Sequence, residues 1–297
     1  MNRLRATSLH PCDVTITIDL EDPRPNPGLP DSFVGATREL IDLLAELKMS
    51  ATFFVIADLA TSHPELVRGI ADAGHEIALH GLDHTPLTSL TPTKFDQQTR
   101  RAKAIIEEIT GRGVTGFRAP IFSLTPATLW AESLLTDQGF SYSSSLLPGR
   151  HPFFNFADAP TEPFRWPSGL LEIPSPLTQL GPLDLPFLGG IYFRYLPYWY
   201  IRRCLDAADA TQSLWFYSHP HDFDHRESFY RIKNTPYWMS LLLWLNRKGT
   251  LGKLRRLLKE PAITITTPFA DQVASGKFAQ AATFQPTAAV PAGPPEC

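Results

Sequence analysis

Two pairs of residues in this sequence have the types and the spacing of a metal site. Asp19 and Glu21 stand two residues apart in V-T-I-T-I-D-L-E-D, and His80 and His84 stand four apart in H-G-L-D-H. Two imidazoles and one carboxylate form a three-ligand catalytic site that leaves positions for water and substrate. Asp19 or Glu21 can supply that carboxylate, and the other can act as a base. Alone, each pair also fits a solvated turn or two loop histidines, so the hypothesis depends on what accompanies them.

Two further motifs carry groups that suit the same chemistry. Arg118 stands in G-F-R-A-P-I-F-S, where an arginine can hold a carboxylate through a charge-assisted fork. His219 stands in F-Y-S-H-P-H-D-F-D, and a histidine can donate a proton to a leaving group near neutral pH. His221 is a second candidate for that proton donor, but it lies beyond Pro220 and ranks below His219.

These groups need elements that bring them together, and each follows a predicted strand. Residues 14–21 alternate with period two, so that the apolar side chains share one face and Asp19 and Glu21 share the other. Strands and helices alternate about seven times along the chain, which predicts parallel β-α units in a barrel or a doubly wound sheet. In both folds, functional groups lie at the C-terminal ends of the strands.

The remaining elements are predicted from apolar periodicity and from glycine at helix ends. The predicted helices are 33–48, 64–73, 92–110, 125–138, 198–210 and 249–259, and the strands after 14–21 are 51–57, 76–80, 114–118, 140–143, 214–219 and 263–267. The segment 147–190 is too long for an ordinary connection, so it should wrap the site or carry function. Residues 277–297 are expected to be a disordered tail, which leaves 1–276 as one catalytic domain.

The composition indicates one large globular unit and excludes some classes of protein. The chain has 297 residues, of which 43% are hydrophobic, and its net charge of -3 argues against a general nucleic-acid binder. No stretch approaches the ~20 apolar residues of a membrane span, and the first residues lack the apolar run of a signal peptide. We expect a cytoplasmic enzyme without an integral membrane segment. Whether it works at the membrane face, and its oligomeric state, stay open.

Together the motifs resemble the polysaccharide deacetylase family, whose members share the chitooligosaccharide deacetylase homology domain. The matching pieces are T-I-D-L-E-D, H-E-I-A-L-H-G-L-D-H, G-F-R-A-P-I-F-S and F-Y-S-H-P-H-D-F-D, in the family's order. More narrowly, G-G-I-Y-F-R-Y-L-P and G-T-L-G-K-L-R-R-L-L resemble the branch found in exopolysaccharide biosynthesis clusters. The resemblance implies a distorted (β/α) barrel of about seven parallel strands.

The resemblance also implies a reaction and roles for the residues. A divalent metal, usually zinc, would help to hydrolyse N-acetyl groups on an amino-sugar-containing glycan. Asp19 matches the catalytic base, Arg118 the arginine that orients it, and His219 the general acid. His80 and His84 match metal ligands. Many members have a second carboxylate where this chain has Leu20, so strand alternation makes Glu21 the replacement, with Asp22 as the alternative.

A second departure from the family pattern concerns Ser143, where this branch commonly has an aspartate. The carboxylate that would tune His219 is also not obvious, and Glu172 is the first candidate and Asp222 the next. We expect Pro120, Tyr192 and Trp166 to contact the sugar. Two alternatives remain: a deacylase of the same fold acting on a small linear or cyclic amide, and a catalytically inactive carbohydrate-binding relative.

Overall fold

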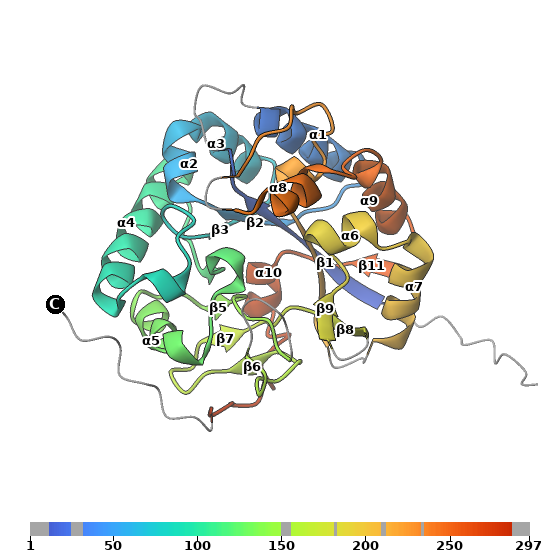
Figure 1. Ribbon diagram of the computed structural model, residues 1–297. Coiled ribbons are helices and arrows are strands. Elements are labelled where there is room, and N and C mark those ends of the chain that lie inside the picture. The colour runs from blue at the N-terminus through green and yellow to red at the C-terminus, as the bar shows by residue number, and fades with distance from the viewer. Residues whose placement is uncertain are drawn as a thin grey trace, which may run out of the picture.

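A curled, mostly parallel sheet forms the centre of the molecule (Figure 1). The computed structural model describes residues 12–24, 32–149, 156–180, 183–208, 212–232 and 235–286. Within these ranges the strand order is β10-β1-β2-β3-β4-β5-β7-β6, with β11 also paired to β1, and only β6 runs antiparallel to its neighbour. The strands of this sheet are β1 Cys12–Leu20, β2 Thr52–Val55, β3 Glu76–Leu79, β4 Gly116–Phe117, β5 Tyr142–Ser143, β6 Phe164–Arg165, β7 Leu171–Glu172, β10 Leu214–Ser218 and β11 Ile263–Ile265.

The expected barrel class is confirmed, in the form of a half-barrel. In the part of the chain that the structure describes, no strand pairing joins β7 to β10, so the curl stays open there. A separate hairpin pairs β8 Leu177–Leu180 with β9 Leu183–Pro186. Residues on both sides of position 140 supply strands to the same sheet, because β10 pairs with β1 and β5 pairs with β4.

Helices surround the sheet and one helix fills its interior (Figure 1). The helices are α1 Ser32–Glu46, α2 Ala57–Ser62, α3 Pro64–Asp72, α4 Pro92–Thr110, α5 Trp130–Asp137, α6 Gly190–Tyr195, α7 Tyr198–Ala207, α8 Tyr237–Trp244, α9 Thr250–Leu258 and α10 Phe269–Ala274. Of these, α10 lies within the curl, where its Gln272 donates to Thr15 on β1. None of the helices in the described ranges is both long enough and apolar enough to cross a membrane.

The period-two alternation of β1 is confirmed, and it sorts the strand's two faces. Val14, Ile16, Ile18 and Leu20 are fully buried in the apolar core that the outer helices cover. Thr15, Thr17 and Asp19 point into the curl, where Thr15 meets the α10 side chain and Thr17 receives a hydrogen bond from Arg118. The inward face of β1 is therefore polar, whereas the neighbouring strands add aromatic residues such as Phe54 and Trp215 to the interior.

The helices α6 and α10 have no counterpart among the predicted elements, and three further places also differ. The helix α2 starts at Ala57, where the sequence pattern predicts only the end of a strand. The segment 147–190 contains the short strands β6 to β9 in its described parts. Residues 277–286 are packed, with Phe278 buried and Phe284 against Trp166, so the expected disorder does not begin at 277. The rest of the predicted tail lies outside the described residues.

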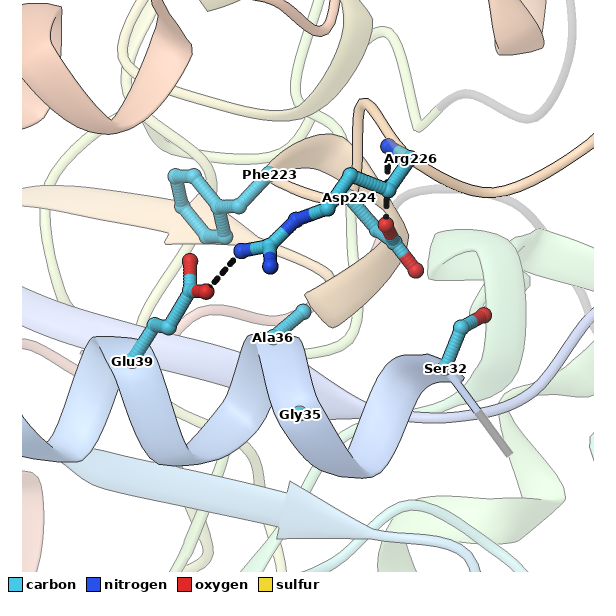
Figure 2. Close-up of a pocket in the computed structure, with 7 residues that line it drawn as sticks. All are labelled: Ser32, Gly35, Ala36, Glu39, Phe223, Asp224 and Arg226. Carbon is cyan, nitrogen blue, oxygen red and sulfur yellow. Dashed lines mark hydrogen bonds and ion pairs between the residues drawn. The ribbon is translucent and has the colours of Figure 1, made fainter. Parts of the chain in front are cut away.

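The loop that follows β10 is held against α1 (Figure 2). Arg226 of this loop reaches across to Glu39 and forms an ion pair with it. Ser32, at the start of α1, donates a hydrogen bond to Glu227 at 3.1 Å. These contacts fix the segment that begins with His219 relative to β1, because α1 follows β1 in the chain.

Candidate active site

A cavity of about 730 Å³ opens at the C-terminal ends of β1, β3 and β10. Its lining includes all five of the predicted residues Asp19, Glu21, His80, His84 and His219. They come from sequence positions up to two hundred residues apart, and the parallel sheet brings them together because each follows the carboxyl end of a strand. Arg118 is fully buried beneath the residues that line the cavity.

Glu21, His80 and His84 form a cluster whose ligand atoms lie within 4.8 Å of one another. The Glu21 carboxylate oxygen Oε2 is 2.5 Å from Nε2 of His84 and 3.8 Å from Nε2 of His80. His80 Nδ1 donates to the carbonyl oxygen of Arg118 at 2.9 Å, which leaves the lone pair of Nε2 directed at the cluster. The chain reaches His84 through Gly81 at φ +94° and returns over the site with His84 itself at φ +54°.

The electrostatics of the cluster suit a cation. Burial lowers the pKa of His80 to about 4, so that this ring is neutral and can act as a ligand. Burial alone would raise the pKa of Glu21, but the charges of His84 and His219 outweigh it and keep the carboxylate ionised. Glu21 Oε2 is buried and faces Nε2 of both His84 and His80. Two imidazole nitrogens and a carboxylate oxygen therefore fit a divalent metal of the zinc type.

A second group, Glu21 with His219 and His221, also lies within 4.8 Å. It is the weaker metal site, because a ligating histidine normally donates its other ring nitrogen to an acceptor. Nδ1 of His221 is buried and has no hydrogen-bond partner in the described structure. Burial also lowers the pKa of His221 to about 3, which removes it as a proton donor near neutral pH.

Arg118 holds Asp19 from inside the barrel. Its Nη1 lies 2.6 Å from Asp19 Oδ1 and also donates to Thr17, and its Nη2 donates to the hydroxyl of Ser144. The guanidinium group stacks over the rings of Phe54 and Trp215 at 3.9 and 4.4 Å. Because these contacts immobilise the arginine, Asp19 Oδ1 is fixed and Oδ2 faces the cavity, 4.0 Å from Nε2 of His219.

A buried chain of three residues positions His219. Asp222 Oδ2 accepts from Nδ1 of His219 at 2.9 Å, and Arg194 Nε lies 3.0 Å from Asp222 Oδ1. Burial disfavours a charge on His219, but the charges of Glu21, Asp222 and Asp19 outweigh it and raise the pKa of His219 to about 9. Asp222, ranked second from sequence, is thus the carboxylate at His219, and Glu172 is not.

Arg194 is absent from the sequence-based predictions, and two glycines explain how it reaches the site. A Cβ on Gly189 would lie 2.2 Å from the carbonyl oxygen of Tyr217, and one on Gly190 would lie 2.9 Å from the Tyr217 ring. Only glycine therefore lets α6 approach β10 this closely. The available signal was an arginine placed in the apolar run G-G-I-Y-F-R, just after those glycines.

The remaining predicted residues are placed as follows. Tyr192 lines the cavity. Pro120 is buried, its ring would contact a Cβ at Gly81, and it lies outside the cavity lining. Trp166 is a core residue, 1% exposed, and its Nε1 donates to Glu172, so it offers no surface to a sugar. Ser143 pairs in register with Glu172 of β7, which brings a carboxyl group next to this serine.

Comparisons with known proteins match two segments of the chain to family models. Residues 13–138 match the family described as polysaccharide deacetylase, and residues 144–267 match a domain of unknown function, DUF3473. A peptidoglycan deacetylase of Helicobacter pylori is 30% identical over 114 residues, which cover 38% of each protein. A chitooligosaccharide deacetylase of Sinorhizobium fredii is 34% identical over 101 residues, covering 34% of this chain and 44% of that protein. The matched stretches thus span less than half the length of these relatives.

A solved structure supports the same fold over most of the chain. It comes from a polysaccharide deacetylase candidate of Mycobacterium smegmatis, and it superimposes with a TM-score of 0.62. The two sequences are 20% identical, and the alignment covers 92% of each chain. The similarity therefore extends across both matched segments, including the part of this chain that carries α6 and β10.

Proposed function

We propose that the chain, whose residues 13–138 match the polysaccharide deacetylase family, removes N-acetyl groups from an amino-sugar-containing glycan. The observation that carries the proposal is one cavity floor on which the Glu21, His80 and His84 cluster lies beside Asp19 and His219. We propose further that residues 1–276 act as one catalytic unit, since both matched segments supply strands to the same sheet.

Asp19 is the proposed base. Oδ1 is occupied by Arg118 at 2.6 Å, so Oδ2 is the atom that accepts the proton of the attacking water. The buried ion pair with the arginine holds the carboxylate so that Oδ2 faces the cavity. Because Arg118 has no access to solvent, the carboxylate cannot rotate away without breaking a buried pair, and that costs about 3–5 kcal/mol.

His219 is the proposed general acid. Its Nε2 faces Asp19 and Glu21 across the floor, at 4.0 and 3.7 Å, and Nδ1 is held by Asp222. A sugar amine cannot leave a tetrahedral intermediate as an amide anion, so it needs a proton at the moment of departure. Nε2 is placed to give that proton, since Asp222 stabilises the charged ring.

Glu21, His80 and His84 would hold a divalent metal, and zinc is the proposed ion. A bound metal at such a site polarises the acyl carbonyl and lowers the pKa of water. The choice of Glu21 over Asp22 rests on strand alternation and on side-chain direction. The Asp22 carboxylate is turned to Arg24, at 2.6 Å, whereas Glu21 faces the two histidines.

The test is release of acetate from a panel of N-acetylated oligosaccharides, with and without chelator, followed by restoration with zinc. We expect metal-dependent release from at least one glycan. Release only from small linear or cyclic amides would move the activity to that alternative class. Zinc binding without turnover on either group would support the inactive carbohydrate-binding alternative and contradict the proposal.

A further inference from the structure

The helix α8 is apolar on almost every side, yet it is not buried. Its sequence is Y-W-M-S-L-L-L-W, and Ser240 is its only buried residue. A helix that is apolar all round normally lies in a protein core or against a membrane. Here it lies beside α6 over the strands, where much of its surface reaches solvent (Figure 1).

Two of its three faces have partners within the protein. On one face, Tyr237 and Trp244 pack on the ring of Phe229, at 5.7 and 5.6 Å between centroids. On a second face, Met239 and Leu243 line the cavity described above. Tyr237 is itself still 59% exposed, so the contacts of Trp244, Met239 and Leu243 determine which side faces outward.

The third face is an exposed apolar stripe, which we call the docking face. The helical period places Trp238, Leu241, Leu242 and Leu245 on it. Trp238 is 61% exposed and Leu245 is 42% exposed. Tyr195 of α6 extends the stripe, since its hydroxyl donates to the Leu242 carbonyl oxygen and the residue is itself 41% exposed.

The docking face is held rigidly in this exposed position. Arg194 Nη1 donates to the carbonyl oxygens of Leu243 and Leu245, at 2.9 and 2.8 Å. Asn246 returns a hydrogen bond to the Arg194 carbonyl oxygen at 2.6 Å. Because these hydrogen bonds tie α8 to a buried arginine, the helix has a fixed position and its apolar surface stays exposed.

Two exposed cations flank the docking face. Other basic residues of this region are paired with carboxylates, as Arg202 is with Asp206 and Arg247 with Glu227. Arg231 and Lys248, exposed just before and just after α8, form no ion pair within the described ranges. An apolar stripe with tryptophan and tyrosine, flanked by cations, matches the chemistry of an anionic lipid surface.

We propose that the docking face binds an anionic lipid bilayer, with α8 lying in its interfacial region. A second copy of this chain is a poorer occupant, because its cations would face those of the first. Since Met239 and Leu243 belong to the same helix, docking would place the mouth of the cavity next to the lipid headgroups. The proposal concerns binding and does not depend on the proposed reaction.

The test uses the full-length protein with vesicles of phosphatidylcholine, either alone or mixed in equal parts with phosphatidylglycerol. We expect sedimentation with the mixed vesicles, weaker sedimentation with the neutral ones, and loss of the difference at high salt. A blue shift of tryptophan fluorescence should accompany binding. Failure of the wild-type protein to bind the mixed vesicles would overturn the proposal, whatever its deacetylase activity.

Matched variants locate the surface. The double variant Trp238→Ser, Leu245→Ser should weaken vesicle binding at least about tenfold, because both apolar contacts are lost. Trp199→Ser is the control, since Trp199 is 68% exposed on α7 and lies outside the docking face. Equal losses in the double variant and the control would contradict the assignment. The assignment would also be contradicted if the wild-type protein were a dimer that does not bind vesicles and if that dimer dissociated in the double variant.

Discussion

At the scale of single residues, the site pairs two charged groups with two buried arginines. Arg118 reaches Asp19 from within the barrel, and Arg194 reaches His219 through Asp222. Both guanidinium groups are almost completely buried, so each is held by its partners instead of by solvent. Arg118 therefore holds the proposed base, Asp19. Arg194 holds Asp222, which in turn stabilises the charged form of the proposed acid, His219.

The first prediction separates those two roles by the leaving group. His219→Ala should reduce acetate release from an N-acetyl sugar by about 10²–10⁴-fold, while largely sparing an activated aryl acetate, whose phenolate leaves without a proton. Asp19→Asn should damage both reactions, since both need the activated water. Steady-state rates on the two substrates provide the measurement. Equal losses on both substrates in His219→Ala would show that it is not the general acid.

The second prediction concerns Arg194 as a positioning residue. Arg194→Met leaves Asp222 without its cation, so kcat on the N-acetyl sugar should fall by about ten- to a hundredfold while kcat on the aryl acetate is largely kept. A purely structural role, through its bonds to Leu243 and Leu245, would lower both rates together. Arg194→Lys restores the charge and should recover part of the amide-specific loss. No recovery, with loss on both substrates, would refute the positioning role.

At the scale of elements, the sequence predicts what depends on local pattern. The sequence predicts Asp19, Glu21 and His80 because each lies at the end of a strand. Such a strand can be recognised from the apolar pattern of a few consecutive residues. The pairing of Arg194 with Asp222 depends on how closely α6 approaches β10, and no spacing in the sequence encodes that distance. Trp166 illustrates the opposite error, because an aromatic residue has the same appearance in a sequence whether it binds a sugar or fills a core.

The third prediction tests that close approach. Gly189→Ala puts a methyl group 2.2 Å from the Tyr217 carbonyl oxygen, so α6 must move and stability should fall by about 1–3 kcal/mol. Activity should fall with it, because α6 carries Arg194 and Tyr192. Gly252→Ala in α9 is the matched control: a Cβ there meets nothing within 4 Å, and stability should stay level or rise by up to ~1 kcal/mol. Urea unfolding of both variants measures the difference, and equal stabilities would contradict the steric argument.

At the scale of the whole molecule, a buried histidine away from the site should couple stability to pH. Nδ1 of His75 accepts a hydrogen bond from the Ala51 N–H, and burial lowers the pKa of His75 below its ordinary value of 6.5. The unfolded chain then binds the proton more readily than the folded one. The contribution of His75 to the free energy of unfolding is fully present above pH 6.5. It is lost as the pH falls toward the lower pKa that His75 has in the folded protein.

The fourth prediction follows from that sign. His75→Asn keeps an acceptor for Ala51 but cannot titrate, so its melting temperature should fall less than that of the wild-type protein between pH 7 and pH 5. The comparison should be made on metal-free protein, so that the cavity histidines behave alike in both. Parallel curves for the two proteins would rule out His75 as a source of acid sensitivity.

The central position of β1 also has a consequence for biosynthesis. Among the strands of the described sheet, β1 comes first in the sequence, but Val14 pairs with Leu214, two hundred residues later, and with Ile265 later still. At about 5–20 residues per second, β1 waits for about 10–40 s with an apolar edge unpaired. Contacts this distant in sequence close slowly. We therefore expect the protein to complete its fold only after synthesis, with the aspartate end of β1 among the last regions to acquire its native surroundings.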